Sequence, residues 1–271
     1  MLSGVFHGQF SRRLTWLKAG RAGMWQSGRM STQSTPSARP VITPESTVGE
    51  LVAARPLLAR VFQKLGIDYC CGGKLTLAVA CARRGLDPAT TVALLESTAA
   101  LTAAGPAEVD ASAMGLTELA DHIEAMHHAY LKTELPRLVE MADRVASKHS
   151  WRDARLPEMA DAVSTLASEL FNHMQKEEAV LFPLVRRIEA GARGDISAPI
   201  AQMEAEHEAA GALTARLREL TDGFTPNAEA CNTHRALLAG LAEFESDQHR
   251  HVHKENNVLF PRALALAGAA A

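Results

Sequence analysis

One block of eleven residues occurs twice in this chain, and it constrains the fold more than any other feature. His173-Met-Gln-Lys-Glu177-Glu-Ala-Val-Leu-Phe-Pro183 and His251-Val-His-Lys-Glu255-Asn-Asn-Val-Leu-Phe-Pro261 share His, Lys, Glu, Val, Leu, Phe and Pro at the same places, 78 residues apart. A lone histidine precedes each block, His128 by 45 residues and His207 by 44. This pattern indicates an internal duplication in which each half supplies one lone histidine and one His-x-x-x-Glu pair.

Helical periodicity sets these polar residues on apolar faces. Residues three and four positions apart share one face of a helix, and on that spacing His173 and Glu177 interrupt an apolar stripe. His207 interrupts a second stripe, and His251 and Glu255 interrupt a third. The apolar members of the stripes are Val163, Leu166, Leu170, Leu181, Leu184 and Ile188; Ile200, Met203, Ala210 and Leu217; and Leu237, Leu241, Phe244 and Leu259. We therefore expect three helices to direct imidazoles or carboxylates into one core.

Turn signals divide residues 116–266 into four amphipathic segments. The signals are Arg155-Leu156-Pro157, Gly191 to Gly194, and Asp222-Gly223 with Pro226. The apolar/polar alternation typical of strands is absent from the sequence between them. Four such helices with short connections predict an all-α fold, an antiparallel up-down four-helix bundle.

Imidazoles and carboxylates inside such a core indicate a metal site. A buried carboxylate without a partner is strongly unfavourable, and a metal ion offsets that penalty. Four His and two Glu exceed the three or four ligands of a zinc site and favour two iron or manganese ions bridged by the carboxylates. With a shared oxo or hydroxo bridge, each ion keeps an open position for a small ligand such as dioxygen or nitric oxide.

The ligand on the first helix is not fixed by periodicity. The apolar residues up to Tyr130 define a helix face on which His127 lies. The apolar residues after it define a face that lies midway between His127 and His128. The first set is Leu116, Leu119, Ile123 and Tyr130, and the second is Leu131, Leu135, Leu138 and Ala142. Among the remaining polar residues, Glu206 is expected to support a ligand, and five histidines are expected to lie on the surface or beside ligands: His122, His149, His234, His249 and His253.

A small helical module is predicted ahead of the bundle. Thr47-Val-Gly-Glu50 has the form of a capping box, the helical spacing that follows runs to Leu65, and Gly66 ends it. A second short helix is expected over residues 74–84, and Asp87-Pro88 starts a third. The expected domains are therefore a leader at 1–43, the module at 44–97, an Ala/Thr/Gly-rich linker at 98–115 and the bundle at 116–266.

Charge and hydropathy exclude two classes of function. The net charge is −3, so the chain lacks the basic excess that nucleic-acid binding needs, and no apolar run approaches the roughly 18 residues that would span a bilayer. Residues 1–40 hold six Lys/Arg and no acid. Such a leader fits either a mitochondrial presequence or an upstream start codon with Met30 opening the chain, and we favour the second interpretation.

Two motifs together resemble a known family. Gly66-Ile-Asp-Tyr-Cys70-Cys71-Gly-Gly-Lys74, followed by a bundle with two His-x-x-x-Glu…Leu-Phe-Pro blocks, is similar over roughly residues 44–266 to the RIC proteins (repair of iron centres, the ScdA/YtfE type). The resemblance implies a hemerythrin-like bundle with a non-haem di-iron centre and a cytoplasmic location. It also implies a role in restoring iron-sulfur clusters damaged by nitric oxide or peroxide.

The resemblance also implies a ligand set. It places the metal ligands at His128, His173, Glu177, His207, His251 and Glu255, with the two glutamates as bridges. In the family the first ligand stands seven residues before a Leu-Pro pair, here Leu135-Pro136, which selects His128 over His127. The ordinary hemerythrin pattern has five histidines, so four make simple oxygen storage a weaker interpretation.

Cys70 and Cys71 add a second chemical possibility. They stand just before the helix expected near Lys74. The dipole of that helix and the ammonium group of Lys74 should lower the pKa of the thiols. Such thiols could bind iron transiently, be nitrosylated, or form an intermolecular disulfide during iron transfer; the alternative is a Gly-rich turn with incidental thiols. Four cysteines without regular spacing form no disulfide framework, and they suggest a reducing compartment.

Three functions use the same ligands. The leading one is an iron donor that repairs damaged iron-sulfur proteins, with Cys70 and Cys71 in delivery. The alternatives are a di-iron nitric oxide reductase and a nitric-oxide-binding protein. A homodimer formed through the Cys70-Cys71 module is a further hypothesis.

Overall fold

The computed structural model describes residues 41–101 and 110–269. Within these ranges every regular element is helical, and the β structure is limited to one isolated bridge between Thr47 and Thr76. The predicted all-α class is confirmed. The expectations for the leader, including the start at Met30, lie outside the described residues.

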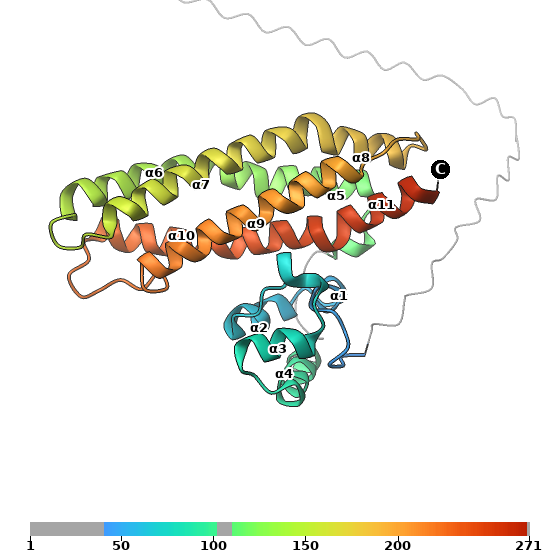
Figure 1. Cartoon of the computed structure of the whole chain (residues 1–271), viewed down its shortest axis with the longest axis horizontal. Coiled ribbons are helices and arrows are strands. Elements are labelled where there is room, and N and C mark those ends of the chain that lie inside the picture. Colours follow the sequence, from blue (N-terminus) through green and yellow to red (C-terminus); the bar gives the residue numbers. More distant parts are fainter. Residues whose placement is uncertain (1–40, 102–109, 270–271) are drawn as a thin grey trace, which may run out of the picture. The chain divides into compact units, whose positions relative to one another are not determined.

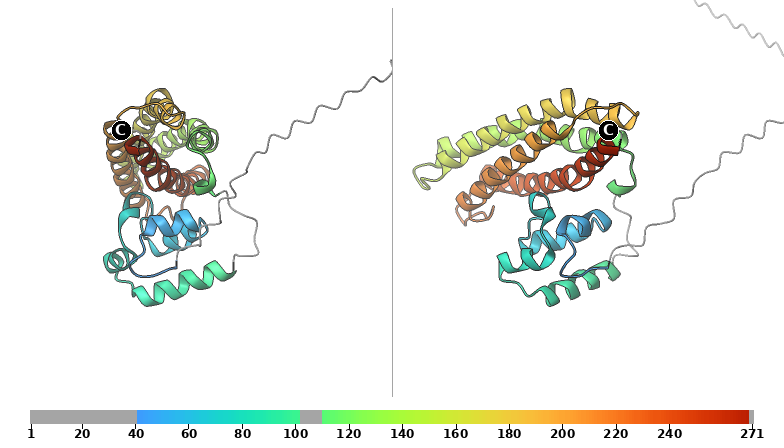
Figure 2. Two further views of the ribbon diagram at one scale, coloured as in Figure 1. Left: turned by 90° about the vertical axis from the view of Figure 1, so that its right-hand side faces the viewer. Right: turned by 45° about the vertical axis from the view of Figure 1, so that its right-hand side comes forward.

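Residues 116–269 form four long helical segments, three of which contain one π-helical turn (Figure 1). The segments are α5 (Leu116–Ile123), η4 (Glu124–His128) and α6 (Ala129–His149); α7 (Leu156–Lys176), η5 (Glu177–Leu181) and α8 (Phe182–Glu189); α9 (Ser197–Leu220); and α10 (Asn232–Lys254), η6 (Glu255–Leu259) and α11 (Phe260–Ala269). Helix α6 packs against α7 and α10, and α7 packs against α9. Figure 2, left, looks along these helices and shows them side by side around one core. The predicted four-helix bundle is confirmed.

The predicted turn signals lie between the segments. Pro157 stands in the first turn of α7, where its missing N–H costs no helical hydrogen bond. Gly191, after α8, has φ 90°, a conformation that L side chains rarely adopt. Three successive residues with positive φ, Asp222 to Phe224, turn the chain after α9.

The bundle core consists of two apolar clusters, one on each side of a layer of polar residues. One cluster holds residues such as Leu131, Leu166 and Phe244, and the other holds residues such as Ile123, Leu181 and Met203. Along each segment the two clusters are separated by buried polar positions: His127 and His128, His173 and Glu177, His207, and His251 and Glu255. The apolar stripes predicted from the sequence thus form the core of the bundle, and the buried His and Glu residues interrupt all four of them at the same height along the bundle.

The N-terminal module begins as predicted and then departs from the prediction. Thr47 and Glu50 form the reciprocal capping box at the start of α1 (Val48–Ala54). The helix expected to run to Leu65 is interrupted at Arg55, which leaves helical geometry because Pro56 follows it. A second helix, α2 (Leu58–Leu65), then ends at Gly66 with φ 65°.

The rest of the module also differs from the prediction in its boundaries. Residues Cys71–Lys74 form the short 3-10 turn η1, and the helix expected from residue 74 is α3 (Leu77–Arg84), because the Thr76 side chain caps it. Asp87 caps the start of α4 (Pro88–Leu101), as predicted. This helix ends at Leu101, inside the predicted linker. A further 3-10 turn, η3 (Ala111–Ala113), precedes the bundle. Among the described helices, none is both long enough and apolar enough to cross a membrane.

Asn257 joins the module to the bundle. It lies in η6, and its side-chain Nδ2 donates to the backbone carbonyls of Tyr69 (3.3 Å) and Cys70 (3.0 Å). Two glycines make room for it: a Cβ at Gly49 or at Gly73 would overlap Asn257 Oδ1. The peptide that carries Cys70 is thereby fixed to the same π-helical turn that contains Glu255.

We predict that Gly73→Ala destabilises the protein by about 1–3 kcal/mol, because the added methyl group displaces Asn257 and leaves two carbonyls without their donor. The midpoint of urea unfolding measures this effect. Gly211→Ala is the matched control, since nothing lies near its Cβ position, and it should be neutral or slightly stabilising. In an Asn257→Ala background the Gly73→Ala penalty should shrink, and an unchanged penalty would contradict the assignment to Asn257.

Candidate metal centre

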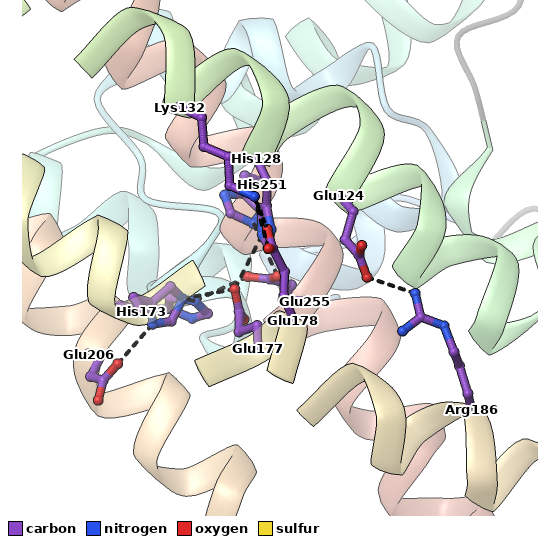
Figure 3. Close-up of polar contacts among 11 residues, drawn as sticks. Glu124, His128, Lys132, His173, Glu177, Glu178, Arg186, Glu206, His251 and Glu255 are labelled. Carbon is purple, nitrogen blue, oxygen red and sulfur yellow. Dashed lines mark hydrogen bonds and ion pairs between the residues drawn. The ribbon is translucent and has the colours of Figure 1, made fainter. Parts of the chain in front are cut away.

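Six buried side chains from four helical segments meet in the polar layer of the bundle (Figure 3). They form two overlapping groups, each with two histidines, and both groups contain Glu177 and Glu255. His128 and His251 complete one group, and His173 and His207 complete the other. Two sites that share two carboxylates are the arrangement that a carboxylate-bridged pair of metal ions requires.

The atoms that face each other have the spacing of metal ligands. In the first group His128 Nε2 lies 3.2 Å from His251 Nε2 and 3.3 Å from Glu177 Oε2. In the second group His173 Nε2 lies 3.0 Å from His207 Nε2 and 3.3 Å from Glu177 Oε2. Glu255 uses one oxygen for each group, at 3.1 Å from His251 and 3.1 Å from His207. Two ligand atoms at about 2.1 Å from one ion and at right angles lie about 3.0 Å apart, so the spacing suits a cation in each group.

Within the described ranges, three of the four oxygens of the shared carboxylates lack a hydrogen-bond partner. Both oxygens of Glu177 and Oε2 of Glu255 are buried without a hydrogen-bond partner among the described residues. Buried polar atoms are normally satisfied, and unsatisfied carboxylate oxygens point to a missing cation. The residues present therefore fit a pair of metal ions.

Three π-helical turns supply three of these residues. His128 ends η4, Glu177 begins η5 and Glu255 begins η6, and in each turn an N–H donates to the carbonyl five residues earlier. In both copies of the block a proline, Pro183 or Pro261, follows the residue that makes this bond, and proline has no N–H to restore the α-helical register. The Leu-Phe-Pro motif therefore favours the wider turn that bears each glutamate, a type of turn frequent at functional sites.

Each lone histidine is oriented by the block of its own half. His128 Nδ1 donates to Glu178 Oε1 at 2.8 Å, and its ring stacks on Phe182. His207 Nδ1 donates to Asn256 Oδ1 at 2.8 Å, and its ring stacks on Phe260. Because Nδ1 is the donor in both rings, Nε2 is left to face the carboxylates. Neither Glu178 nor Asn256 was singled out from the sequence, although both directly follow a glutamate of the repeated block.

The block histidines have less similar surroundings. His173 Nδ1 donates to Glu206 Oε2 at 2.9 Å, and Lys176 Nζ holds the same carboxylate at 2.5 Å, so the expected support by Glu206 is observed. Burial would raise the pKa of Glu206, but Lys176 and His173 lower it to about 2. His251 instead stacks face to face on His127 with ring centroids 5.2 Å apart.

The charges of the site balance through its histidines when no cation is present. Burial would lower the pKa of His173, yet the Glu177 carboxylate raises it to about 9. Burial would likewise raise the pKa of Glu255, but His251 and His207 hold it well below its ordinary value. In the metal-free protein, protons on the imidazoles thus take the place of the positive charge that a metal would bring.

His127 and His128 have separate roles. His127 Nδ1 donates to Asp247 at 3.0 Å, and Lys254 Nζ donates to His127 Nε2 at 2.6 Å. Neither ring nitrogen therefore faces the two shared glutamates. Burial lowers the pKa of His127 to about 4, which keeps its ring neutral. His128 is the histidine that faces Glu177, as the family resemblance implied.

The five other histidines are only partly as expected. His253 is buried rather than exposed, and its Nδ1 donates to the Tyr69 carbonyl at 3.3 Å. His249 and His253 both contact the Tyr69 ring edge to face. These two residues serve the contact with the N-terminal module, and no sequence pattern marked them for it.

The surroundings of Cys70 contradict the expected lowering of thiol pKa. Its hydrogen bond with Cys71, burial and the Asp68 charge raise the pKa of the Cys70 thiol. Lys74, which was expected to act on the thiols, pairs with Glu204 at 2.8 Å. The helix expected to start near Lys74 begins at Leu77 instead, and the element next to the thiols is the four-residue turn η1, which is too short for a strong dipole. Cys81 is buried in the module core.

We predict that His128→Gln loses most of the bound metal while His127→Gln retains it, because only His128 faces the shared carboxylates. The measurement is metal per chain, by mass spectrometry on anaerobically purified protein. The two variants change adjacent residues of the same type, so each serves as the control for the other. Equal loss in both variants would contradict the separate roles assigned here.

Comparisons with known proteins agree with this geometry. Residues 116–263 match the family described as hemerythrin HHE cation binding domain, and residues 44–99 match ScdA_N, a domain of unknown function (DUF542). The chain is 40% identical over 221 residues to the iron-sulfur cluster repair protein YtfE of Musicola paradisiaca, covering 81% of this chain and 96% of the relative. It is 38% identical to the proteins of the same name from Escherichia coli O157:H7 and an Enterobacter species, covering 82% of this chain and 97% of each relative.

The two matched regions cover both motifs of the sequence, and the bundle holds buried His and Glu groups that could bind a cation, as a cation-binding domain requires. This chain belongs to the family of YtfE-type iron-sulfur cluster repair proteins, with a hemerythrin-like metal-binding bundle.

Proposed function

We propose that this protein repairs iron-sulfur clusters damaged by nitrosative or oxidative stress, and that it does so by donating iron from a two-iron centre in the bundle. The observation that carries the proposal is the pair of buried groups that share Glu177 and Glu255. The name of its relatives, iron-sulfur cluster repair protein, supports the same activity.

The proposed ligands are His128, His173, Glu177, His207, His251 and Glu255, with the two glutamates as bridges. Two iron ions held there would supply exchangeable iron and open positions for nitric oxide or dioxygen. The chain itself supplies an asymmetric surrounding: Glu206 places a carboxylate on His173, whereas neutral His127 stacks on His251. We therefore expect the two positions to hold iron with unequal affinity.

Release of iron from this centre is coupled to protons. When iron leaves, two buried carboxylates lose their cation, and the penalty for burying them is large. Protonation of the imidazoles offsets it, as the raised pKa of His173 indicates for the metal-free site. Solvent protons can thus replace iron without unfolding the bundle, which suits a protein that gives up its metal.

Five further expectations remain predictions. Cys70 and Cys71 are proposed as thiols that take part in iron transfer, and damaged iron-sulfur proteins are the proposed partners. Nitric oxide or dioxygen as small ligand, a homodimer through the N-terminal module, and a cytoplasmic location complete the proposal.

The deciding experiment is reactivation of a nitric-oxide-damaged iron-sulfur dehydratase by the iron-loaded protein. We expect the wild type to restore more activity than the same amount of free iron, and the His173→Ala, Glu177→Ala variant to restore none. A Glu140→Ala, His149→Ala variant removes the same residue types from α6 away from the polar layer and should act like the wild type. Reductant-driven turnover of nitric oxide without repair would instead favour a nitric oxide reductase, and tight binding without turnover or repair would favour a nitric-oxide-binding protein.

We also predict that the metal-free protein becomes less stable as the pH rises from about 6.5 to about 9. The pKa of His173 is about 9 in the folded metal-free protein against an ordinary 6.5, so its stabilising contribution is complete below 6.5 and lost through 9. Urea unfolding of metal-free protein at the two pH values measures the change. The His173→Gln variant should show a smaller change, and an identical change in both proteins would contradict this assignment.

A further inference from the structure

The Cys70-Cys71 turn carries a second cluster of metal-binding groups, separate from the bundle centre. One ligand atom each of Asp68, Cys70 and Cys71 lies within 4.8 Å of the others. Cys70 Sγ is 3.1 Å from Asp68 Oδ1 and 4.0 Å from Cys71 Sγ. Two thiolates bound at about 2.3 Å to one tetrahedral ion lie about 3.8 Å apart, so the two sulfurs already have the separation of ligands to one ion.

The backbone holds these groups in place. Asp68 Oδ1 accepts the N–H groups of Cys70 (2.9 Å) and Cys71 (3.1 Å), and Oδ2 accepts that of Gly72 (3.0 Å). From the other side, Asn257 fixes the carbonyls of Tyr69 and Cys70. A site whose donors are fixed before binding loses little conformational freedom when an ion arrives.

A cavity of about 930 Å³ gives access to the cluster. Asp68, Cys70 and Cys71 line it together with His249 and His207 of the bundle. The Nδ1 of His249 is buried and has no hydrogen-bond partner among the residues that the structure describes. His249 lies outside the three-residue group, but it presents an unsatisfied imidazole nitrogen at the same cavity.

We propose that Asp68, Cys70 and Cys71 form a third metal site, which binds a single divalent cation that accepts thiolate ligands, such as Fe²⁺ or Zn²⁺. Binding replaces the two S–H protons, which pass to solvent, by two metal–sulfur bonds, and no electron is transferred. The Asp68 carboxylate supplies a third ligand. The pKa of the Cys70 thiol is raised by its hydrogen bond with Cys71, by burial and by the Asp68 charge, and a bound cation would offset the last two of these effects. A role for this site in iron delivery rests on the proposed function, whereas the binding of the cation does not.

Cobalt(II) added to the reduced, iron-loaded full-length protein tests the proposal. Thiolate ligands give sulfur-to-cobalt charge-transfer absorption in the near ultraviolet, which the His and Glu ligands of the bundle cannot produce. We expect this absorption to saturate at one cobalt per chain. It should vanish in Cys70→Ser and in Cys71→Ser, and Asp68→Asn should weaken cobalt binding by about tenfold or more.

Two controls separate this proposal from its alternatives. Cys231→Ser alters a thiol that caps α10 outside the cluster, and it should leave the absorption unchanged. The His173→Ala, Glu177→Ala variant should keep the absorption while it loses bundle iron, so failure of the bundle centre and failure of the thiol site are distinguishable. Cys71 is only partly buried, so Cys71→Ser should fold normally, and an unchanged unfolding midpoint checks this. Absence of the absorption in the wild type, or its survival in both cysteine variants, would overturn the proposal.

Discussion

The burial of two carboxylates at the centre of a four-helix bundle is the constraint on which the rest of this structure depends. Glu177 and Glu255 are 0% exposed, and each isolated buried charge would cost several kcal/mol. Four imidazoles surround them; hydrogen-bond acceptors behind His128, His173 and His207 turn the other ring nitrogens toward the carboxylates, and His251 is held by stacking on His127. The polar layer therefore requires either protons or metal ions to balance its carboxylates.

The duplication explains why the centre needs the whole bundle. Each lone histidine is oriented by the block of its own half, through Glu178 and Phe182 or through Asn256 and Phe260. Each metal-binding group, however, pairs a lone histidine of one half with the block histidine of the other. Neither half could form a complete group alone, so the pseudo-symmetric fold and the paired site depend on each other.

The π-helical turns connect the site with the N-terminal module. Turn η6 presents Glu255 to the centre and, two residues later, Asn257 to the peptide that carries Cys70. The corresponding residue in the first block is Ala179, whose side chain cannot make such hydrogen bonds. The second copy of the block has thus acquired a contact that the first lacks, and that contact fixes the thiol turn beside the cavity that His207 also lines.

Local patterns were enough to predict the class of fold and to place His173, Glu177, His207, His251 and Glu255 on inward faces of helices, because helical periodicity, the capping box and the repeated block survive without tertiary context. The sequence could not separate His127 from His128 by periodicity. The stripe changes phase there because η4 inserts a wider turn, and only the packed helices show which ring faces Glu177. The break before Pro56 is a local signal that the apolar spacing did not reveal, and the Cys70 thiol owes its high pKa to adjacent Cys71, to burial and to nearby Asp68. The packed fold revealed the roles of Glu178, Asn256 and Asn257. Those roles depend on groups far apart in the chain, whose distances no sequence spacing encodes.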